Sequence, residues 1–223
     1  RRSEIYVILC PMPRNYIVAD VGGTHIRVAC FPTQSHTPTI LKRIYTKGSE
    51  SPHERLINLI DLVAPKEEEI AAITIAASGS LDPYEGIIYE APNVPGWTHL
   101  PLKKLLQDRF NVAVAIGNDG NLAALGEWRF GAGIGHSHLI YITVSTGIGG
   151  GVIINNQLLL GTHGFAAELG HITVIPNGPL CGCGKCGHLE AVSSGLAIAH
   201  WAEQELRQGI PSILPVNRSL NAK

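Results

Sequence analysis

The chain has 223 residues, of which 45% are hydrophobic and 16% are charged, and its formal net charge is −1. This composition predicts a folded protein with one sizeable core or two small ones, and it excludes a disordered chain. Because no run of five or six like charges occurs, the sequence lacks the electrostatic footprint of a protein that binds nucleic acid or an anionic membrane.

The first half of the chain alternates strands and helices. Residues 16–31 predict a strand, a tight glycine turn and a second strand, which is the pattern of a β-hairpin. Residues 51–65 carry apolar side chains at helical spacing, with Ser51 as the N-cap. Residues 70–79 form a run of β-branched residues and alanines that is typical of a buried strand. This order predicts an α/β layer architecture.

The next segments repeat this design. A helix is predicted at residues 100–110, a buried strand at 112–119 and a further helix at 120–133. Residues 138–161 again give an apolar strand, a glycine-rich turn and an apolar strand. The repetition of the hairpin predicts two related halves, each with a turn that faces the same ligand.

We place the boundary of the two halves at the strand that precedes the third helix. The predicted organisation is an N-terminal extension over residues 1–15, an N-terminal α/β domain over 16–117 and a C-terminal α/β domain over 118–223. No linker rich in glycine or serine separates the halves.

Both hairpin turns carry residue types that suit a phosphate. In the first turn, Gly22 and Gly23 let backbone N–H groups approach an oxyanion, and Thr24 adds a hydroxyl donor. A plain hairpin turn would also explain these two glycines. The second turn, STGIGGG at residues 145–151, repeats the chemistry. Neither turn has the lysine of a P-loop or opens a Rossmann helix, so together they predict two hairpins that clamp a polyphosphate.

Five segments, in this order, resemble the ROK family of sugar kinases and repressors: DVGGTHIR, GNDGNLAALGE, STGIGGG, ELGH and CGCGKCGHLE. The E-x-G-H and C-x-C-G-x-x-G-x-x-E segments are specific to that family. The resemblance runs from about residue 16 to about residue 200. It implies an actin-like ATPase fold of the ribonuclease H-like kind, with two α/β domains, a ligand cleft between them and an incomplete second domain.

The resemblance implies an ATP-dependent kinase for glucose or a related hexose. Asp119 matches the family's general base, which takes the proton of the sugar hydroxyl that attacks the γ-phosphate. The alternative role for Asp119 is to cap the following helix. For Glu168 and Glu190 the alternative is a solvated surface charge. The implied substrate-binding residues are Gly79, Asn118, Asp119, Glu168, His171 and Glu190.

The resemblance also implies ATP with Mg²⁺ as the phosphoryl donor. Asp20 matches the family's residue near the metal and the phosphates, where Mg²⁺ would bridge phosphate oxygens. The implied phosphate-binding residues are Asp20, Gly22, Gly23, Thr24, Arg27, Thr146, Gly147 and Gly149.

A structural zinc ion is implied by the cysteine-rich segment. In the family, the zinc is bound by the histidine of the E-x-G-H segment and by three cysteines. His171, Cys181 and Cys183 match, but His188 stands at the third cysteine position. We prefer His188 as the fourth ligand because it keeps the family's register, and Cys186 is the alternative. A redox pair of Cys183 and Cys186 is less favoured because no strand-to-helix start surrounds it.

Localisation and partners are predicted from what the sequence lacks. Its apolar runs fall short of the roughly 18 residues of a membrane span, and its odd number of cysteines is unlike a secreted disulfide framework, so we expect a cytoplasmic protein. We expect a hexose as the partner, no nucleic acid and no membrane. The family implies a homodimer or a higher homo-oligomer.

The resemblance ends where family members continue with a segment that packs on adenine and ribose. We therefore expect poor ATP affinity and turnover from this 223-residue chain. Two alternative functions stay open. One is a sugar-responsive transcriptional regulator of the same family, which would carry a DNA-binding domain ahead of Tyr16. The other is an inactive paralogue that binds sugar.

Overall fold

The structure is a computed structural model that describes residues 14–66 and 69–213. The chain divides into two compact units, the first ending at Asn118 and the second beginning at Asp119. This division lies one residue after the boundary that the sequence predicts, because the strand before it runs to Asn118. Most of the predicted N-terminal extension lies outside the described residues.

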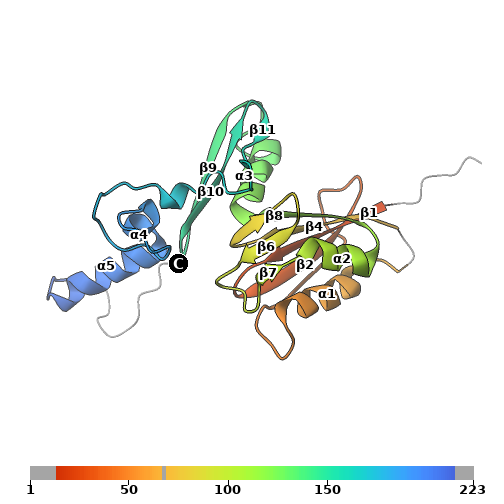
Figure 1. The fold of residues 1–223 in the computed structure, drawn as a ribbon, viewed down its shortest axis with the longest axis horizontal. Helices are drawn as coiled ribbons and strands as arrows, with labels where there is room; N and C mark the ends of the chain where they lie inside the picture. The colour runs from red at the N-terminus through yellow and green to blue at the C-terminus, as the bar shows by residue number, and fades with distance from the viewer. Residues whose placement is uncertain (1–13, 67–68, 214–223) are drawn as a thin grey trace, which may run out of the picture. The chain divides into compact units, whose positions relative to one another are not determined.

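Unit 1 is built on a mixed five-stranded sheet with the order β3-β2-β1-β4-β8 (Figure 1). Strands β1, β2 and β3 pair antiparallel, whereas β4 pairs parallel with both β1 and β8. The predicted first hairpin is therefore confirmed. The strands are β1 (Arg14–Val21), β2 (His25–Pro32), β3 (Ile40–Tyr45), β4 (Glu69–Ala77) and β8 (Ala113–Asn118).

Two helices pack against one face of this sheet (Figure 1). Helix α1 (Pro52–Val63) starts with a capping box, in which Ser51 and Glu54 satisfy each other's backbone N–H groups. Helix α2 (Leu102–Phe110) ends at Asn111, which adopts the left-handed conformation. The core lies between the apolar faces of these helices and the alternate side chains of the strands. It includes Ile17, Ile73 and Ile75 from the strands and Leu56, Ile60 and Leu106 from the helices.

A small antiparallel sheet, which the sequence analysis does not predict, follows β4. It consists of β5 (Ser80–Asp82), β6 (Ile87–Glu90) and β7 (Thr98–Leu100). Strands of this length show too little of the two-residue period to be recognised. The loop between β6 and β7 folds back on the core and buries Trp97, and it also carries Asn93, which contacts the first hairpin turn.

Unit 2 starts with α3 (Asp119–Phe130), which packs against β10 of a three-stranded antiparallel sheet of order β11-β10-β9 (Figure 1). The second predicted hairpin is confirmed. Unit 2 buries few apolar side chains, among them Ala124, Ile148, Ile153 and Ala199. The other elements are β9 (Leu139–Val144), β10 (Ile148–Ile154), β11 (Gln157–Leu158), the 3-10 helix η1 (Leu169–His171), α4 (Leu189–Ser193) and α5 (Gly195–Arg207).

Within the described ranges, no helix combines the length and the apolar character that crossing a membrane requires.

Candidate functional site: two phosphate turns and a carboxylate cluster

The first glycine turn joins β1 to β2 and is held from one side by Thr46. The Gly22 N–H donates to the His25 carbonyl at 3.0 Å, while the Thr46 N–H donates to the Thr24 carbonyl at 2.9 Å. The Thr46 hydroxyl donates to the Gly22 carbonyl at 2.6 Å. In a trans peptide the C=O and N–H groups point in opposite directions, so the N–H of Gly23 is turned away from Thr46. The turn therefore has the backbone arrangement that an oxyanion needs.

Asp20 and Arg27, both predicted at the phosphate end, contact each other. They are direct partners in the β1-β2 register, and the Arg27 Nη1 lies 2.6 Å from the Asp20 Oδ2. Both side chains are about half exposed. Because an exposed ion pair contributes little stability, a bound phosphate or cation can compete for either member.

The second turn joins β9 to β10 and is held by the start of α5. The Ser145 N–H donates to the Gly147 carbonyl at 2.9 Å. The carbonyls of Ser145 and Thr146 accept from the N–H groups of Gly195 at 2.8 Å and Leu196 at 3.4 Å. By the same peptide geometry, the N–H groups of Thr146 and Gly147 point away from α5. In both turns, the carbonyls are thus engaged from one side and N–H groups are presented on the other.

Glu190 connects this second turn to the cysteine-rich loop. Its Oε2 accepts from the Ile148 N–H at 2.8 Å, and its Oε1 lies 3.8 Å from the Cys181 Sγ. A Cβ atom on Gly147 would collide with the Glu190 Oε2, so a larger residue there would displace this carboxylate. A Cβ atom on Gly149 would come within 3.3 Å of the Thr143 side chain. One oxygen of Glu190, a predicted sugar ligand, is therefore committed to the protein backbone.

In unit 2, Asp119, His171 and Glu190 lie close enough to Glu168 to influence the pKa of its carboxyl group. Partial burial of its carboxyl group raises the pKa of Glu168 above its ordinary value; nearby His171 opposes this rise, and the carboxylates of Glu190 and Asp119 add to it. The His171 Nε2 lies 4.0 Å from the Glu168 Oε2. The Glu168 side chain is 55% exposed, so a solvated charge stays the alternative for this residue.

Asp119 is the first residue of α3 and not the last residue of a strand. Its Oδ1 accepts from the Gly120 N–H at 2.9 Å. This bond is to the adjacent residue, whereas a helix N-cap accepts from an N–H two or three residues on. The carboxylate also influences the pKa of Glu168.

Two other predicted sugar ligands belong to unit 1. The Asn118 Nδ2 donates to the Gly79 carbonyl at 3.3 Å, which joins the ends of β8 and β4. Gly79 has a φ of +100°, and a Cβ atom there would collide with the Glu90 carbonyl. A glycine is therefore required at this position.

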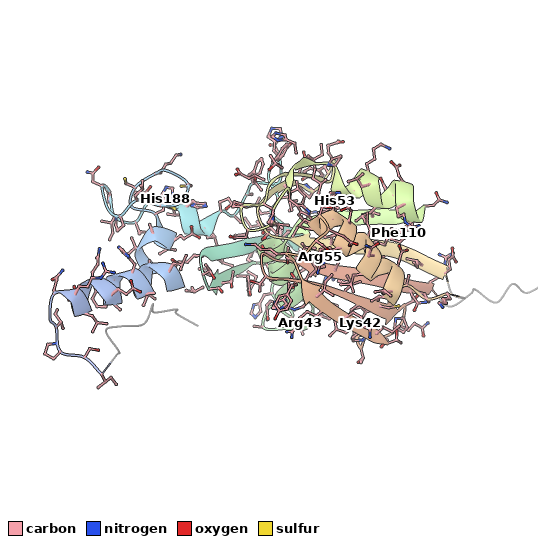
Figure 2. The ribbon with its side chains drawn as sticks, turned by 90° about the horizontal axis from the view of Figure 1, so that it is seen from below. Lys42, Arg43, His53, Arg55, Phe110 and His188 are labelled. Atoms are coloured by element: carbon pink, nitrogen blue, oxygen red, sulfur yellow. The ribbon has the colours of Figure 1, made fainter. Side chains whose placement is uncertain are left out.

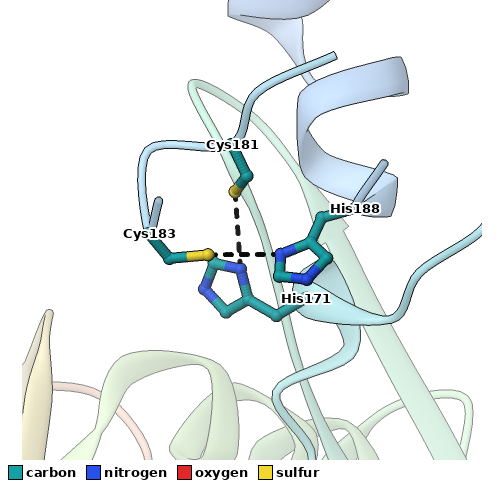
Figure 3. A group of neighbouring side chains, drawn as sticks. All are labelled: His171, Cys181, Cys183 and His188. Carbon is teal, nitrogen blue, oxygen red and sulfur yellow. Dashed lines mark hydrogen bonds between the residues drawn. The ribbon is translucent and has the colours of Figure 1, made fainter. Parts of the chain in front are cut away.

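The structure brings together His171, Cys181, Cys183 and His188, whose ligand atoms all lie within 4.8 Å of one another (Figure 3). The Cys181 Sγ is 3.6 Å from the His171 Nδ1, and the Cys183 Sγ is 3.2 Å from the His188 Nδ1. Two thiols and two imidazoles are a donor set that suits tetrahedral zinc. Burial raises the pKa of the Cys181 thiol, so a metal bound there would have to displace its proton.

Cys186 is outside this group of four in the described part of the chain. Its backbone forms an isolated β-bridge with Leu180, and its side chain is exposed. A second bridge, between Thr173 and His188, places the His188 side chain on the inner side of the loop, where it is 4% exposed. The geometry therefore favours His188 over Cys186 as the fourth donor.

Two residues at the site were not identified from the sequence. Thr46 follows β3 and is fully buried, and an isolated threonine after a strand gives no sequence signal. Ser78 lies between β4 and Gly79, and within residues 14–66 and 69–213 its buried hydroxyl has no hydrogen-bond partner. Both are recognised only once the strands β1, β3 and β4 are placed side by side.

A mixed sheet that opens with a hairpin, followed by a second hairpin that repeats its glycine turn, is the arrangement of an actin-like ATPase fold. The ROK family model matches residues 16–214. This chain belongs to the ROK family, as its sequence motifs indicate.

Related proteins in this family include kinases and repressors. A glucokinase from Thermotoga maritima is 40% identical over 204 residues, which are 89% of this chain and 62% of the relative. A Streptomyces griseus ROK glucokinase, solved with glucose and AMPPNP, is 38% identical with a TM-score of 0.70, over 87% of this chain and 62% of that one. A xylose repressor from Bacillus spizizenii is 37% identical over 182 residues, 82% of this chain and 45% of the repressor. The chain thus spans about 62% of the length of its kinase relatives.

Proposed function

We propose that this chain contains the sugar-binding and phosphoryl-transfer residues of an ATP-dependent hexose kinase that acts on glucose or a related sugar. The observation that carries the proposal is the convergence of Asp119, Glu168, Glu190 and His171 in the unit that also holds the second phosphate turn. Carboxylates accept hydrogen bonds from sugar hydroxyls, which gives a specificity that apolar contacts do not.

In this proposal each group has a distinct task. Asp119 accepts the proton of the attacking sugar hydroxyl, Glu168 and the second oxygen of Glu190 orient the sugar, and the two turns hold the phosphates. Mg²⁺ bound with ATP would neutralise phosphate charge, and Asp20 is the carboxylate of this chain that would face it. Phosphoryl transfer needs mainly positioning and charge stabilisation, which these groups supply.

A structural zinc ion held by His171, Cys181, Cys183 and His188 is part of the proposal. The two ring nitrogens of His171 face different partners, since Nδ1 is directed to Cys181 and Nε2 to Glu168. A metal on Nδ1 would fix the tautomer that carries a proton on Nε2 and would keep that N–H directed at the carboxylate cluster. A cytoplasmic location and a homo-oligomeric state stay predictions.

The experiment that tests the proposed function is an ADP-release assay over a panel of hexoses with Mg·ATP, combined with sugar binding by calorimetry. We expect ADP release that depends on the added hexose, with a high KM for ATP. The similarity to the xylose repressor supports a second candidate, a sugar-responsive regulator. Sugar binding with no ADP release at any ATP concentration would favour that regulator or an inactive sugar-binding paralogue.

Replacing Gly147 with alanine tests the contact between the second turn and Glu190. The added methyl group would push the carboxylate off the Ile148 N–H. A hydrogen bond to a charged group contributes about 1.5–3 kcal/mol, so we expect kcat/KM for sugar phosphorylation to fall about 10-fold to 100-fold. Gly126→Ala in α3 is the matched control: nothing outside its own helix turn lies within 4 Å of the new methyl group, and the variant should gain about 1 kcal/mol of stability. Equal activity of both variants would contradict the role of this contact.

A further inference from the structure

We propose that Thr46 is the positioning residue of the first phosphate turn, because its side chain and backbone fix the peptide groups that a phosphate would meet. This inference rests on the proposed function and adds a residue to it. Thr46 directly follows β3, is 0% exposed and touches the turn at both ends.

The two hydrogen bonds of Thr46 act on successive parts of the turn. Its hydroxyl donates to the Gly22 carbonyl at 2.6 Å, and its N–H donates to the Thr24 carbonyl at 2.9 Å. Without these bonds, either carbonyl could rotate toward the ligand and place a negative partial charge against the phosphate. With them, the N–H of Gly23 is held on the ligand side. In the described part of the chain, this N–H donates to no protein acceptor.

A second contact restricts the turn at Gly23, where the loop between β6 and β7 packs against it. A Cβ atom on Gly23 would lie 2.6 Å from the Asn93 Cβ and 2.9 Å from its carbonyl oxygen. The glycine therefore packs directly on the loop between β6 and β7. With Asn93 packed on Gly23 and Thr46 bonded to the Gly22 and Thr24 carbonyls, the turn has little room to flip its peptide groups.

Thr46 is itself anchored to helix α1. Arg55 on α1 (Figure 2) donates to the carbonyl of Tyr45, with Nε at 3.2 Å and Nη2 at 2.9 Å. The Tyr45 ring also stacks on His25 of β2, with ring centroids 5.0 Å apart. These contacts fix the backbone that carries Thr46, so its hydroxyl cannot follow the Gly22 carbonyl if the turn moves.

The second turn shows why one side chain matters at the first. There, the N–H groups of Gly195 and Leu196 engage the two carbonyls, and no side chain is needed. At the first turn, the Gly22 carbonyl depends on the Thr46 hydroxyl alone among the described groups. A single substitution can therefore release it.

The test compares Thr46→Val, which keeps shape and removes the hydroxyl, with Thr46→Ser, which keeps the hydroxyl. The probe is Mg²⁺ with inorganic tripolyphosphate, because it needs no nucleoside pocket. We expect the unsubstituted chain and Thr46→Ser to show a shift of the Gly23 amide resonance on titration. We expect Thr46→Val to bind tripolyphosphate about tenfold more weakly, because one buried hydrogen bond is lost, while its affinity for glucose stays unchanged.

The KM for ATP should rise by the same factor in Thr46→Val, while the KM for glucose stays constant. Equal tripolyphosphate affinity in all three chains, or no Gly23 shift in the unsubstituted chain, would overturn the role of Thr46. A parallel loss of glucose affinity in Thr46→Val would also overturn it, since it would indicate general unfolding. A shift that depends on Thr46 in a chain without sugar phosphorylation would overturn the proposed activity alone.

Discussion

Replacing Asp119 with asparagine is expected to lower kcat for sugar phosphorylation by roughly 10²–10⁴-fold, the contribution that a general base makes. Asparagine keeps an Oδ1 that can accept from the Gly120 N–H, so the start of α3 should be preserved. Hexose affinity should change little, because the side chain keeps its size. The measurement is ADP release at saturating hexose, with hexose binding by calorimetry.

The control is Asp108→Asn, the same chemical change on the surface of α2. Asp108 is an exposed residue that pairs with Lys104 at 2.7 Å, and such a pair contributes little to stability. Its loss should leave kcat unchanged. If Asp119→Asn retains full turnover while Asp108→Asn does too, Asp119 only starts the helix and another group takes the proton.

The hairpins and the helices α1, α2 and α3 could be predicted from the sequence because their signals are local, whereas α5 was not predicted. A glycine pair between apolar runs indicates a turn, and Ser51 followed by Glu54 indicates a helix start. The strand limits depended on more distant contacts. Asp119 was predicted to end a strand, but it is the first residue of α3 and its Oδ1 accepts from the adjacent Gly120 N–H.

The site is harder to predict because its residues are brought together by tertiary contacts. The charge of Asp119 reaches Glu168 only through the packing of α3 and η1 around β10. Thr46 is 24 residues from the carbonyl it binds, so no local pattern connects them. Family motifs predict Glu190 as a sugar ligand, but its bond to the Ile148 N–H could be seen only in the structure.

Removing the proposed zinc should destabilise the cysteine-rich loop more than any other part of unit 2. This loop has little hydrophobic core of its own: Ile172, Val174 and Leu180 are 54%, 45% and 71% exposed. In small zinc domains the metal contributes on the order of 10–16 kcal/mol, so a loop with so few buried apolar contacts should lose its fold without it. Unit 1, with a continuous apolar core, should keep its own stability.

The variants Cys181→Ser and His188→Ala should each lose about one zinc ion per chain by elemental analysis. Amide hydrogen exchange should then become fast in residues 172–188 and stay slow in β1 and β4. Cys186→Ser is the matched control, because Cys186 shares the loop but its side chain lies outside the group of four donors. It should retain the metal and the protection. Zinc loss from Cys186→Ser together with zinc retention by His188→Ala would reverse the assignment of the fourth ligand.

Since Glu190 lies 3.8 Å from Cys181 and binds the second turn, unfolding of the loop should also release that turn and weaken phosphate binding.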